Sequence, residues 1–320
     1  MSPYIIRRLS LVIPLLLGIT IINYTIYALA PGDPVSAMIN PMEAHEWSAE
    51  DLQKARARLG LDKPIPVRYA LWLGQAARGN LGFSVRTGLS VRETMVRGIG
   101  NTITLIALSM VLSSLGGIVL GILSALRPYS ALDYALTAFA FAGASMPGFF
   151  LGLLLIYFVS LGLGILPTGG ISPPGVEPNV LNRLEHMILP VAALTYEGLG
   201  SLLRFTRAGM LEVLSQDYVT TARSKGLMER AVIGRHAFRN ALLPLITMLG
   251  LRLPGLLGGS LLIEVVFNYP GIGSIMVDAT RQRDYPLVMG GVLVTAVAVL
   301  LANLIADIAY GVADPRIRYE

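Results

Sequence analysis

Six long apolar segments constrain this chain more than any other feature. They cover residues 9–30, 102–126, 135–162, 187–206, 241–263 and 287–310. A helix needs about 20 mostly apolar residues to cross the hydrocarbon core of a bilayer, which is roughly 30 Å thick. In lipid, every backbone polar group must be satisfied within the protein, and an α-helix meets that demand within one segment. The sequence therefore predicts an all-α polytopic membrane protein with six transmembrane helices.

The composition agrees with a membrane protein and excludes several kinds of site. Hydrophobic residues make up 54% of the chain and charged residues 14%, whereas charged residues are about 25% of a soluble domain. The chain has no cysteine, which excludes disulfides, thiolate catalysis and Cys-based metal sites. Its three histidines lie far apart, so we predict no metal site. The net charge of +5 comes with basic residues near span ends, and we expect no nucleic-acid partner.

Proline and basic residues refine the spans and their orientation. Pro147 removes a backbone donor inside the third segment, so we expect a kink or break there. Basic residues favour the cytoplasmic side of short loops. One side holds Arg7, Arg8, Arg127, Arg316, Arg318 and the seven basic residues from Arg204 to Arg239; the other holds Arg183, Arg281 and Arg283. Both termini are therefore expected in the cytoplasm.

This orientation gives a domain organisation. Residues 1–30 form the first span, which is longer than the apolar part of a signal peptide and is expected to be retained. Residues 31–100 form an extracytoplasmic loop. A core of five spans covers 101–310 and includes a cytoplasmic insert at 207–240. A cytoplasmic tail covers 311–320.

The loop 31–100 contains residues typical of helix starts and ends, and it is expected to be helical. Ser48-Ala49-Glu50-Asp51 resembles a capping box that opens a helix ending near Gly60. Pro66 is expected to open a second helix over 67–78, ending at Gly79. Ser90-Val91-Arg92-Glu93 is a better capping box, and Val91, Met95 and Ile99 repeat at helical spacing. The loop is either a folded cap over the helices or a docking surface for a soluble donor protein.

Residues 217–244 form a basic, polar segment whose pattern predicts a helix, a bend and a second helix. Asp217 is expected to cap the first helix, over 218–225. Gly226 fits the left-handed position that ends many helices, and the apolar pair Leu227 and Met228 follows it. The second helix is expected from Glu229 to Pro244. Its inward residues are Val232, Ala237 and Leu242, and its outward residues are Arg230, Arg235 and Arg239.

Two roles fit this segment. Cytoplasmic loops are basic because of topology, so the segment can lie on anionic lipid. Alternatively, the glycine bend presents a short protrusion to another protein. The bend favours the second interpretation, because a helix that lies on lipid presents one long amphipathic ridge.

Ionisable residues inside the spans are costly and are candidates for a polar pathway. They are Glu197, Arg204, Arg252 and Asp307. Arg204 follows Glu197 by seven positions and so lies near the same helix face. The structural alternative is an Arg–Glu pair inside the bundle, or snorkelling of the charged side chains near a span end.

The sequence gives little support to two classes of membrane protein. A secondary transporter often has internal repeats and coupling carboxylates at mid-membrane, whereas this chain has no convincing repeat and few such carboxylates. An intramembrane enzyme needs a paired-Asp, His-Glu-x-x-His or Ser–His arrangement, and the spans contain none. No catalytic residue is therefore predicted.

The segment 217–244, called the insert from here on, resembles the cytoplasmic signature loop of ABC-importer permeases. The residues 222–227 (Ala-Arg-Ser-Lys-Gly-Leu), His236 and 239–244 (Arg-Asn-Ala-Leu-Leu-Pro) resemble the dipeptide/oligopeptide/nickel subgroup. The start at 4–18, the stretches 59–62 and 79–84, and the end at 314–320 also resemble that subgroup, so the likeness runs the whole length. The usual Glu-Ala-Ala triplet reads Thr220-Thr221-Ala222 here, which leaves the first helix's contacts open.

The resemblance implies a type I ABC importer permease in a bacterial or archaeal cytoplasmic membrane. A second homologous permease, forming a heterodimer or a homodimer, two ATPase subunits and an extracytoplasmic binding protein are the implied partners, besides membrane lipid. The implied coupling residues are Ala222, Arg223, Lys225, Gly226, Leu227, Met228 and Glu229.

The same resemblance implies import of short peptides by alternating access, or of nickel chelates or glutathione by the same mechanism. A P-loop needs Gly-Lys-Ser/Thr, and each of the chain's three lysines follows a residue other than glycine. The chain is therefore expected to be neither an enzyme nor a cofactor protein. The resemblance implies that ATP and Mg²⁺ are bound by the partner ATPases.

Overall fold

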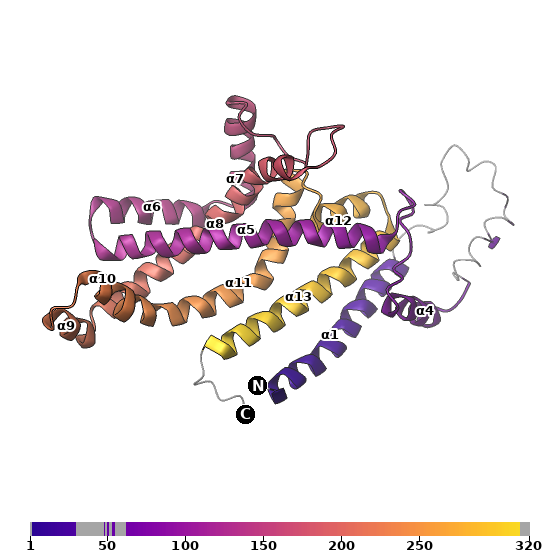
Figure 1. The fold of residues 1–320 in the computed structure, drawn as a ribbon. Helices are drawn as coiled ribbons and strands as arrows, with labels where there is room; N and C mark the ends of the chain where they lie inside the picture. The colour runs from indigo at the N-terminus through magenta and orange to yellow at the C-terminus, as the bar shows by residue number, and fades with distance from the viewer. Residues whose placement is uncertain (1, 30–47, 49, 51–52, 55–61, 314–320) are drawn as a thin grey trace. The chain divides into compact units, whose positions relative to one another are not determined.

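The computed structural model describes residues 2–29, 48, 50, 53–54 and 62–313. These residues are almost entirely helical (Figure 1), and the described part has no β-strand beyond an isolated bridge between Phe83 and Ser90. The chain divides into two compact units. Unit 1 comprises Thr102–Pro270 and the chain from Leu301, and unit 2 comprises Ser2–Asn101 and Gly271–Leu300.

Unit 1 is built around the long helix α8, which contacts most of the unit's other helices. Its elements are α6 (Ala131–Ser145), α7 (Gly148–Leu155), the π-helix η1 (Ile156–Gly162), α8 (Val180–Leu214) and α11 (Arg239–Val266), with most of α5 (Val91–Leu126) and the end of α13 (Tyr285–Ala313). Helices α6, α7 and α11 all pack on α8. The main core combines Leu105 of α5, the buried residues 187–194 of α8, and Ile263, Phe267 and Tyr269 at the end of α11.

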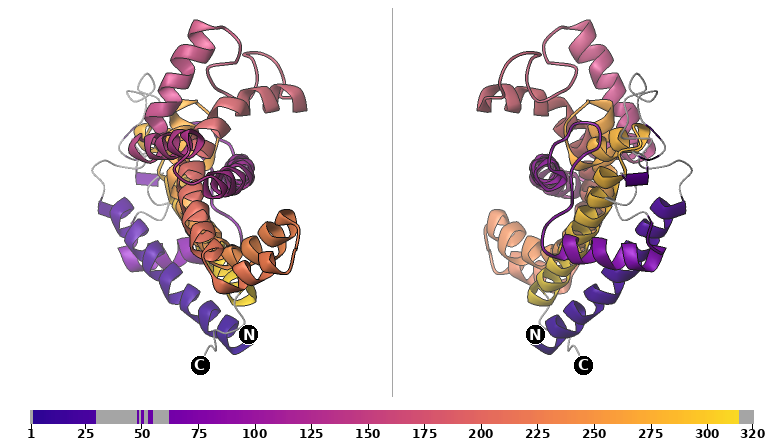
Figure 2. Two further views of the ribbon diagram at one scale, coloured as in Figure 1. Left: turned by 90° about the vertical axis from the view of Figure 1, so that its left-hand side faces the viewer. Right: turned by 90° about the vertical axis from the view of Figure 1, so that its right-hand side faces the viewer.

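The third apolar segment is broken at the expected residue. Helix α6 ends at Ser145, Pro147 caps α7, and the axes of the two halves differ by 104°. Figures 1 and 2 show α7 turning away from the line of α6. Because Pro147 lacks an N–H and restricts the preceding residue, the helix cannot continue through it. The segment is thus a broken span or a re-entrant loop.

Three described helical stretches are long and apolar enough to cross a membrane. They are Ser10–Leu29, Val91–Leu126 and Tyr285–Ile308, and the broken pair adds a fourth if it counts as one span. The remaining two predicted segments lie within α8 and α11, which are 35 and 28 residues long. These two helices are not among those that meet the length and apolarity criterion in the described residues.

Glycines let α5 and α8 approach each other closely. A Cβ atom on Gly121 would lie 2.5 Å from the Cβ of Thr206, and one on Gly117 would lie 2.5 Å from the Cβ of Leu202. Real atoms do not approach so closely, so a side chain at either position would push the helices apart. Small residues of this kind permit tight helix packing where lipid supplies no hydrophobic drive.

Unit 2 joins α1 (Ser2–Leu29), α4 (Ile65–Ala77), the first turns of α5, α12 (Ile272–Arg281) and the beginning of α13. Its core contains Val91 and Met95 of α5 with Ile272, Ala279 and Leu287. Aromatic rings of Tyr24, Tyr27, Tyr69, Trp72 and Tyr285 pack on one another across α1, α4 and α13. The sequence did not predict the short helix α12.

The helices predicted for the loop 31–100 are confirmed where they fall on described residues. Helix α4 begins at Ile65 with proline in its first turn and is followed by Gly79 at φ +79°. The Ser90 hydroxyl accepts a 3.5 Å hydrogen bond from the Glu93 N–H at the start of α5. Helix α5 then runs on as one helix of 36 residues. The capping box at 48–51 and the helix end at Gly60 lie outside the described residues.

Candidate functional site

The predicted helix, bend and second helix are all present in the insert. Helix α9 (Asp217–Ser224) follows α8 after two residues, and α10 (Glu229–Ala231) continues through the π-helix η2 (Val232–Phe238) into α11. The expected cap is wrong by one position: Gln216 is the capping residue, and no side chain caps α9. Asp217 instead lies in the first turn, where its charge favours the positive end of the helix dipole.

Gly226 ends α9 in the left-handed conformation that the sequence predicts. Its φ is +75°, and its N–H donates a 2.9 Å hydrogen bond to the carbonyl of Arg223. The N–H of Leu227 donates to the carbonyl of Ala222 at 3.4 Å. This pair of bonds defines a Schellman motif. A Cβ atom at Gly226 would meet nothing within 4 Å, so the need for glycine is conformational rather than steric.

The insert rests on the end of α8 through its apolar side. Val219 and Ala222 of α9 and Val232 of η2 are buried and pack against Val213 and Leu214. A second cluster joins Ala237 and Ala241 to Met210 of α8 and Ala125 of α5. Val232 and Ala237 thus face inward as predicted, while the Leu242 side chain lies outside the description. The contacts make the insert an extension of the helix bundle.

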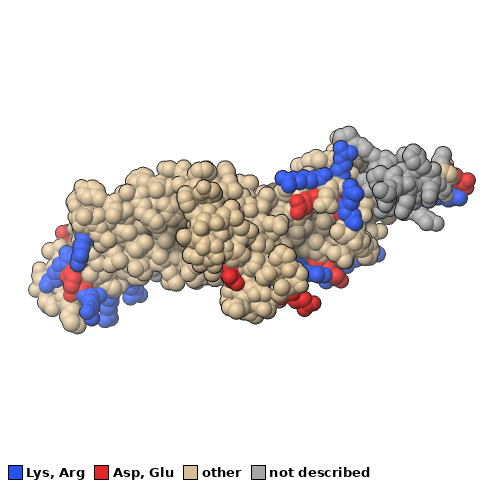
Figure 3. All heavy atoms as spheres, turned by 90° about the horizontal axis from the view of Figure 1, so that it is seen from above, with Lys and Arg blue, Asp and Glu red and all other residues tan. Residues whose placement is uncertain are grey.

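The tip of the insert, defined as Gly226, Leu227 and Met228, faces away from this packing. The Met228 side chain is 78% exposed and that of Leu227 44%. Arg230, Arg235 and Arg239 are exposed, as predicted. Figure 3 shows basic and acidic side chains gathered at the end of unit 1 that holds the insert, beside a mostly uncharged surface. An exposed apolar tip on ordered helices is a feature of a docking surface.

An ion pair braces the bend from outside. The Arg223 Nη2 lies 2.7 Å from Glu229 Oε1, and Arg223 Nε donates a 3.3 Å hydrogen bond to Glu229 Oε2. These hydrogen bonds lower the pKa of the Glu229 carboxyl and raise the pKa of the Arg223 guanidinium. Farther along, the Asn240 side-chain amide donates to the Tyr218 hydroxyl at 3.0 Å. The first contact joins α9 to α10, and the second joins α9 to the first turn of α11.

The structure brings two of the four candidate pathway residues into range of each other. Arg252 Nη1 donates a 3.0 Å hydrogen bond to the carbonyl of Gly198, next to Glu197, whose carboxylate interacts electrostatically with Arg252. The Glu197 side chain is exposed and not enclosed by the chain. Asp307 is half-buried on α13.

Arg204 and Glu197 lie on one helix face but do not pair with each other. In the described residues no salt bridge joins them; the Arg204 guanidinium lies 5.1 Å from the ring centroid of Phe141. Seven residues of α-helix advance about 10 Å along the axis, so the two side chains share a face but not a contact. The Arg204 Nε is buried without a hydrogen-bond partner in the structure.

Two buried carboxylates form contacts that sequence reasoning missed. Glu264 Oε1 accepts hydrogen bonds from the hydroxyls of Thr102, at 2.6 Å, and Ser260, at 3.3 Å. In unit 2, Asp284 accepts from the Ser84 hydroxyl and from the N–H groups of Val85 and Leu287. Thr102 and Ser84 are 162 and 200 positions from their partners, and the sequence carried no signal for either pair.

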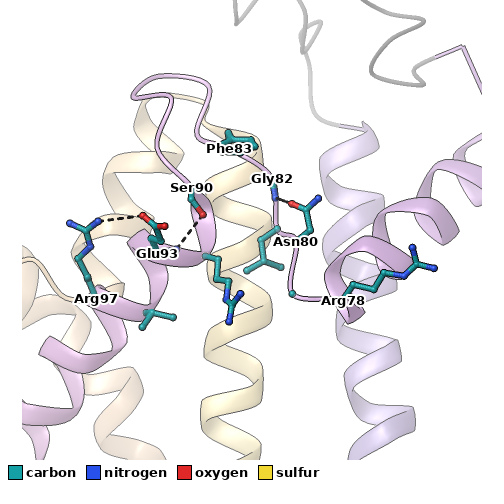
Figure 4. A pocket seen from close by; sticks show the side chains of 11 residues that line it. Arg78, Asn80, Gly82, Phe83, Ser90, Glu93 and Arg97 are labelled. Atoms are coloured by element: carbon teal, nitrogen blue, oxygen red, sulfur yellow. Dashed lines mark hydrogen bonds and ion pairs between the residues drawn. The ribbon is translucent and has the colours of Figure 1, made fainter.

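Asp284 thereby anchors a loop whose other side lines an open pocket. The pocket of about 760 Å³ lies in unit 2 between the end of α4 and the first turns of α5. Figure 4 shows Arg78, Asn80, Phe83, Glu93 and Arg97 around it. Glu93 and Arg97 form an exposed pair at 3.6 Å, and Arg92 also lines the pocket. The surface is basic, with the exposed ring of Phe83 beside it.

Comparison with known proteins assigns this architecture to a family. Residues 117–319 match the model described as "Binding-protein-dependent transport system inner membrane component", and residues 1–106 match the model of that family's N-terminal part. The chain is 44% identical over 320 residues to the oligopeptide transport system permease protein AppB of Bacillus subtilis, with both chains fully covered. It is 38% identical over 341 aligned residues to the dipeptide transport system permease protein DppB of Escherichia coli, again with full coverage.

The fold agrees with a solved structure of an amino acid ABC transporter. The match has a TM-score of 0.53 and 16% sequence identity, and it covers 70% of this chain and 94% of the other. At that identity the likeness concerns the fold alone. The sequence matches extend along the whole length, and they show that the chain belongs to the family of binding-protein-dependent transport system inner membrane components.

Proposed function

We propose that this chain is one permease subunit of an ATP-driven importer of short peptides. The observation that carries the proposal is the ordered, exposed tip at Gly226–Met228, joined rigidly to α8 and α11, in a chain whose relatives include named oligopeptide and dipeptide permeases. A subunit that has no nucleotide site of its own needs such a contact to receive work from an ATPase. ATP and Mg²⁺ belong to that partner.

The segment from Ala222 to Glu229 acts as the coupling helix. Leu227 and Met228 enter an apolar groove on the ATPase, while Lys225 and the Arg223–Glu229 pair meet its polar rim. Ala222 faces inward and acts through packing. When two ATPases close around ATP, the tips move with them as rigid bodies, and the attached helices alternate between outward-facing and inward-facing arrangements.

The insert and both termini lie in the cytoplasm in this proposal, and the loop of unit 2 lies outside. The basic pocket with exposed Phe83 supports a docking role for that loop rather than a purely structural one. Its partner is the binding protein, which presents a complementary acidic surface. A second, homologous permease completes the pathway, and a heterodimer is the arrangement we propose.

Glu197, Arg204, Arg252 and Asp307 supply polar groups along the pathway. A short peptide carries one amino and one carboxylate terminus, so the neighbouring opposite charges of Glu197 and Arg252 suit it. Because the guanidinium forks of Arg252 and Arg204 suit carboxylates, they also suit glutathione and anionic nickel chelates. Peptide transport is favoured over these two alternatives by the names of the relatives.

Substitution at Gly226 tests the coupling role. The complete transporter, with its second permease, ATPases and binding protein, is reconstituted in liposomes, and labelled peptide import and ATP hydrolysis are measured together. Gly226→Val is expected to abolish most import, because a β-branched residue is strained at φ +75°. Gly226→Asn is the matched control, because asparagine tolerates this conformation.

The two variants differ in backbone strain but not in steric clash, since the space around Gly226 is open. Both are expected to reach the membrane in the amount of the unaltered chain. Equal import by Gly226→Val and the unaltered transporter would falsify the coupling role. ATP hydrolysis by the purified chain without partners would overturn the assignment as a permease subunit.

A further inference from the structure

A partly buried ion pair lies in unit 1, and its Arg207 directly follows the predicted end of the fourth apolar segment. Arg207 of α8 holds Asp133 of α6 with two hydrogen bonds, Nε to Oδ1 and Nη2 to Oδ2, each 2.7 Å. The Asp133 side chain is 3% exposed and that of Arg207 is 25% exposed. Such a two-pronged contact fixes both distance and orientation, which a single ammonium group cannot do.

Asp133 also accepts hydrogen bonds from the end of α5 and from the turn that joins α5 to α6. Its carboxylate accepts a hydrogen bond from the Ser124 hydroxyl near the end of α5 and a 2.9 Å bond from the N–H of Tyr129. Tyr129 has φ +60°, an uncommon conformation for a residue with a side chain. Four donors from three parts of the chain thus converge on one carboxylate, and they join α5, the turn, α6 and α8.

The joined region continues directly into the insert. Met210, three residues after Arg207, is buried against Ala125 of α5, Ala237 of η2 and Ala241 of α11. Helix α8 ends at Leu214, and only Ser215 and Gln216 separate it from α9. Because this connection is short and packed, a displacement of the tip is expected to move the α8 turn that carries Arg207.

The pair is expected to fix the relative position of its helices more than it increases the free energy of unfolding. Removing two charges from water costs about as much as their attraction returns, so apolar residues of similar volume often stabilise such a site equally well. Neighbouring helices can slide past each other along apolar contacts. A guanidinium bonded through two nitrogens to a carboxylate instead holds the two helices in one register. Close backbone packing at Gly117 and Gly121 clamps α5 and α8 farther along.

We propose that Asp133 and Arg207 are positioning residues for coupling: they lock the α5–α6 turn to α8, so that movement of the tip is transmitted to α5, α6 and α8 as one body. The inference rests on the proposed coupling role of the insert. It assigns a function to two residues that lie outside the tip.

The test uses the complete reconstituted transporter and measures imported peptide per ATP hydrolysed. Arg207→Lys keeps the charge but loses the fork. The double variant Asp133→Asn with Arg207→Gln replaces the ion pair by two neutral amides and leaves no buried charge unpaired. Glu212→Gln is the matched control, because it neutralises an exposed carboxylate on α8 outside the network. Asp133→Asn alone leaves the Arg207 charge without its carboxylate partner and is expected to lower the amount of folded protein.

For Arg207→Lys and the double variant we expect folded complexes whose ratio of import to hydrolysis falls at least about fivefold, the lower end of ordinary coupling between distant sites. Glu212→Gln keeps the ratio of the unaltered transporter. A purely structural pair predicts instead that import and hydrolysis fall together with the amount of folded complex, and an unchanged ratio in both variants overturns the inference.

The two proposals fail separately. If Gly226→Val uncouples transport and neither Arg207→Lys nor the double variant does, the coupling role of the insert stands and the positioning role of Asp133 and Arg207 is refuted. If Gly226→Val leaves import unchanged, the coupling role itself is refuted, and the positioning role with it, whatever the Arg207 variants do.

Discussion

The Arg223 guanidinium meets the Glu229 carboxylate across the bend at Gly226, with Nη2 and Oε1 2.7 Å apart. The two residues stand at the end of one helix and the start of the next, so the pair closes the turn from its solvent side. The Schellman hydrogen bonds close the same turn from within. The tip is therefore held by two independent sets of contacts before any partner arrives.

We predict that Glu229→Gln loosens the bend without unfolding the insert. Exposed ion pairs contribute little and are screened by salt, so the effect is small and about 1 M salt should reproduce it in the unaltered chain. Hydrogen exchange of residues 217–232 in the purified complex measures it. Faster exchange is expected for Glu229→Gln and not for Glu212→Gln; equal rates in all three proteins would contradict the brace.

The pH dependence of this brace follows from the lowered pKa of Glu229. A carboxyl whose pKa is lower in the folded state contributes its stabilisation fully above its unfolded pKa, which is about 4.3. That contribution is lost as the pH falls through the folded pKa. Between about pH 6 and 8, protection of the bend should therefore stay constant once intrinsic exchange rates are corrected.

Met228 is predicted to contribute most of the apolar contact with the ATPase. Burying a methionine side chain is worth about 1.5–3 kcal/mol, and tenfold in affinity corresponds to about 1.4 kcal/mol. Met228→Ala should therefore weaken ATPase binding by about tenfold or more, as measured by titration of the ATPase onto immobilised permease. Met228→Leu preserves the volume and should bind nearly as well.

A control for that measurement is Leu181→Ala, which shortens another exposed apolar side chain, at the start of α8. It should leave ATPase affinity unchanged. If Met228→Ala binds the ATPase as tightly as the unaltered chain, the exposed tip is not the contact surface.

The buried Glu264 should respond unequally to the loss of its two hydroxyl donors. Thr102→Val removes the 2.6 Å hydrogen bond with almost no change of shape, while Ser260→Ala removes the 3.3 Å one. Depriving a buried polar group of a donor costs about 1–3 kcal/mol. Thermal unfolding in detergent should show the larger drop for Thr102→Val; a larger drop for Ser260→Ala would reverse the assignment of the stronger bond.

The orientation of the chain can be tested through its lack of cysteine. Single cysteines at Val176, exposed in the loop after η1, and at Ser224, exposed at the end of α9, provide specific labelling sites. A membrane-impermeant maleimide should label Val176→Cys in intact cells stripped of their outer envelope. It should label Ser224→Cys only after permeabilisation, and the opposite pattern would invert the proposed topology.

Local features of this fold follow from the sequence because their causes are local. The positive φ of Gly226, the break at Pro147 and the capping bond between Ser90 and Glu93 each depend on residues within one turn. The prediction of Asp217 as a cap was wrong because Gln216 turns the backbone one residue earlier. Helix α12 was missed because ten residues of mixed polarity between two turns do not resemble a span.

Long-range pairs could not be predicted. Asp133 and Arg207 are 74 positions apart, and Thr102 and Glu264 are 162 apart. A single sequence identifies helices and their apolar faces, but it contains no statement of which helices are neighbours. Glu197 and Arg204 illustrate the opposite error: helical spacing aligned their faces correctly, and the rise along the axis kept the charges apart.

The π-helix at Val232–Phe238 sets the phase between the tip and the membrane helix that follows it. Such turns hold an extra residue relative to an α-helix, and each α-helical residue advances the chain by about 100° around the axis. Each π-helical residue therefore advances the chain by less than 100°, and α11 has a different phase relative to the tip than it would have if these seven residues were α-helical. In the proposed coupling role, the direction in which a push on Met228 reaches the bundle thus depends on the backbone geometry of these seven residues.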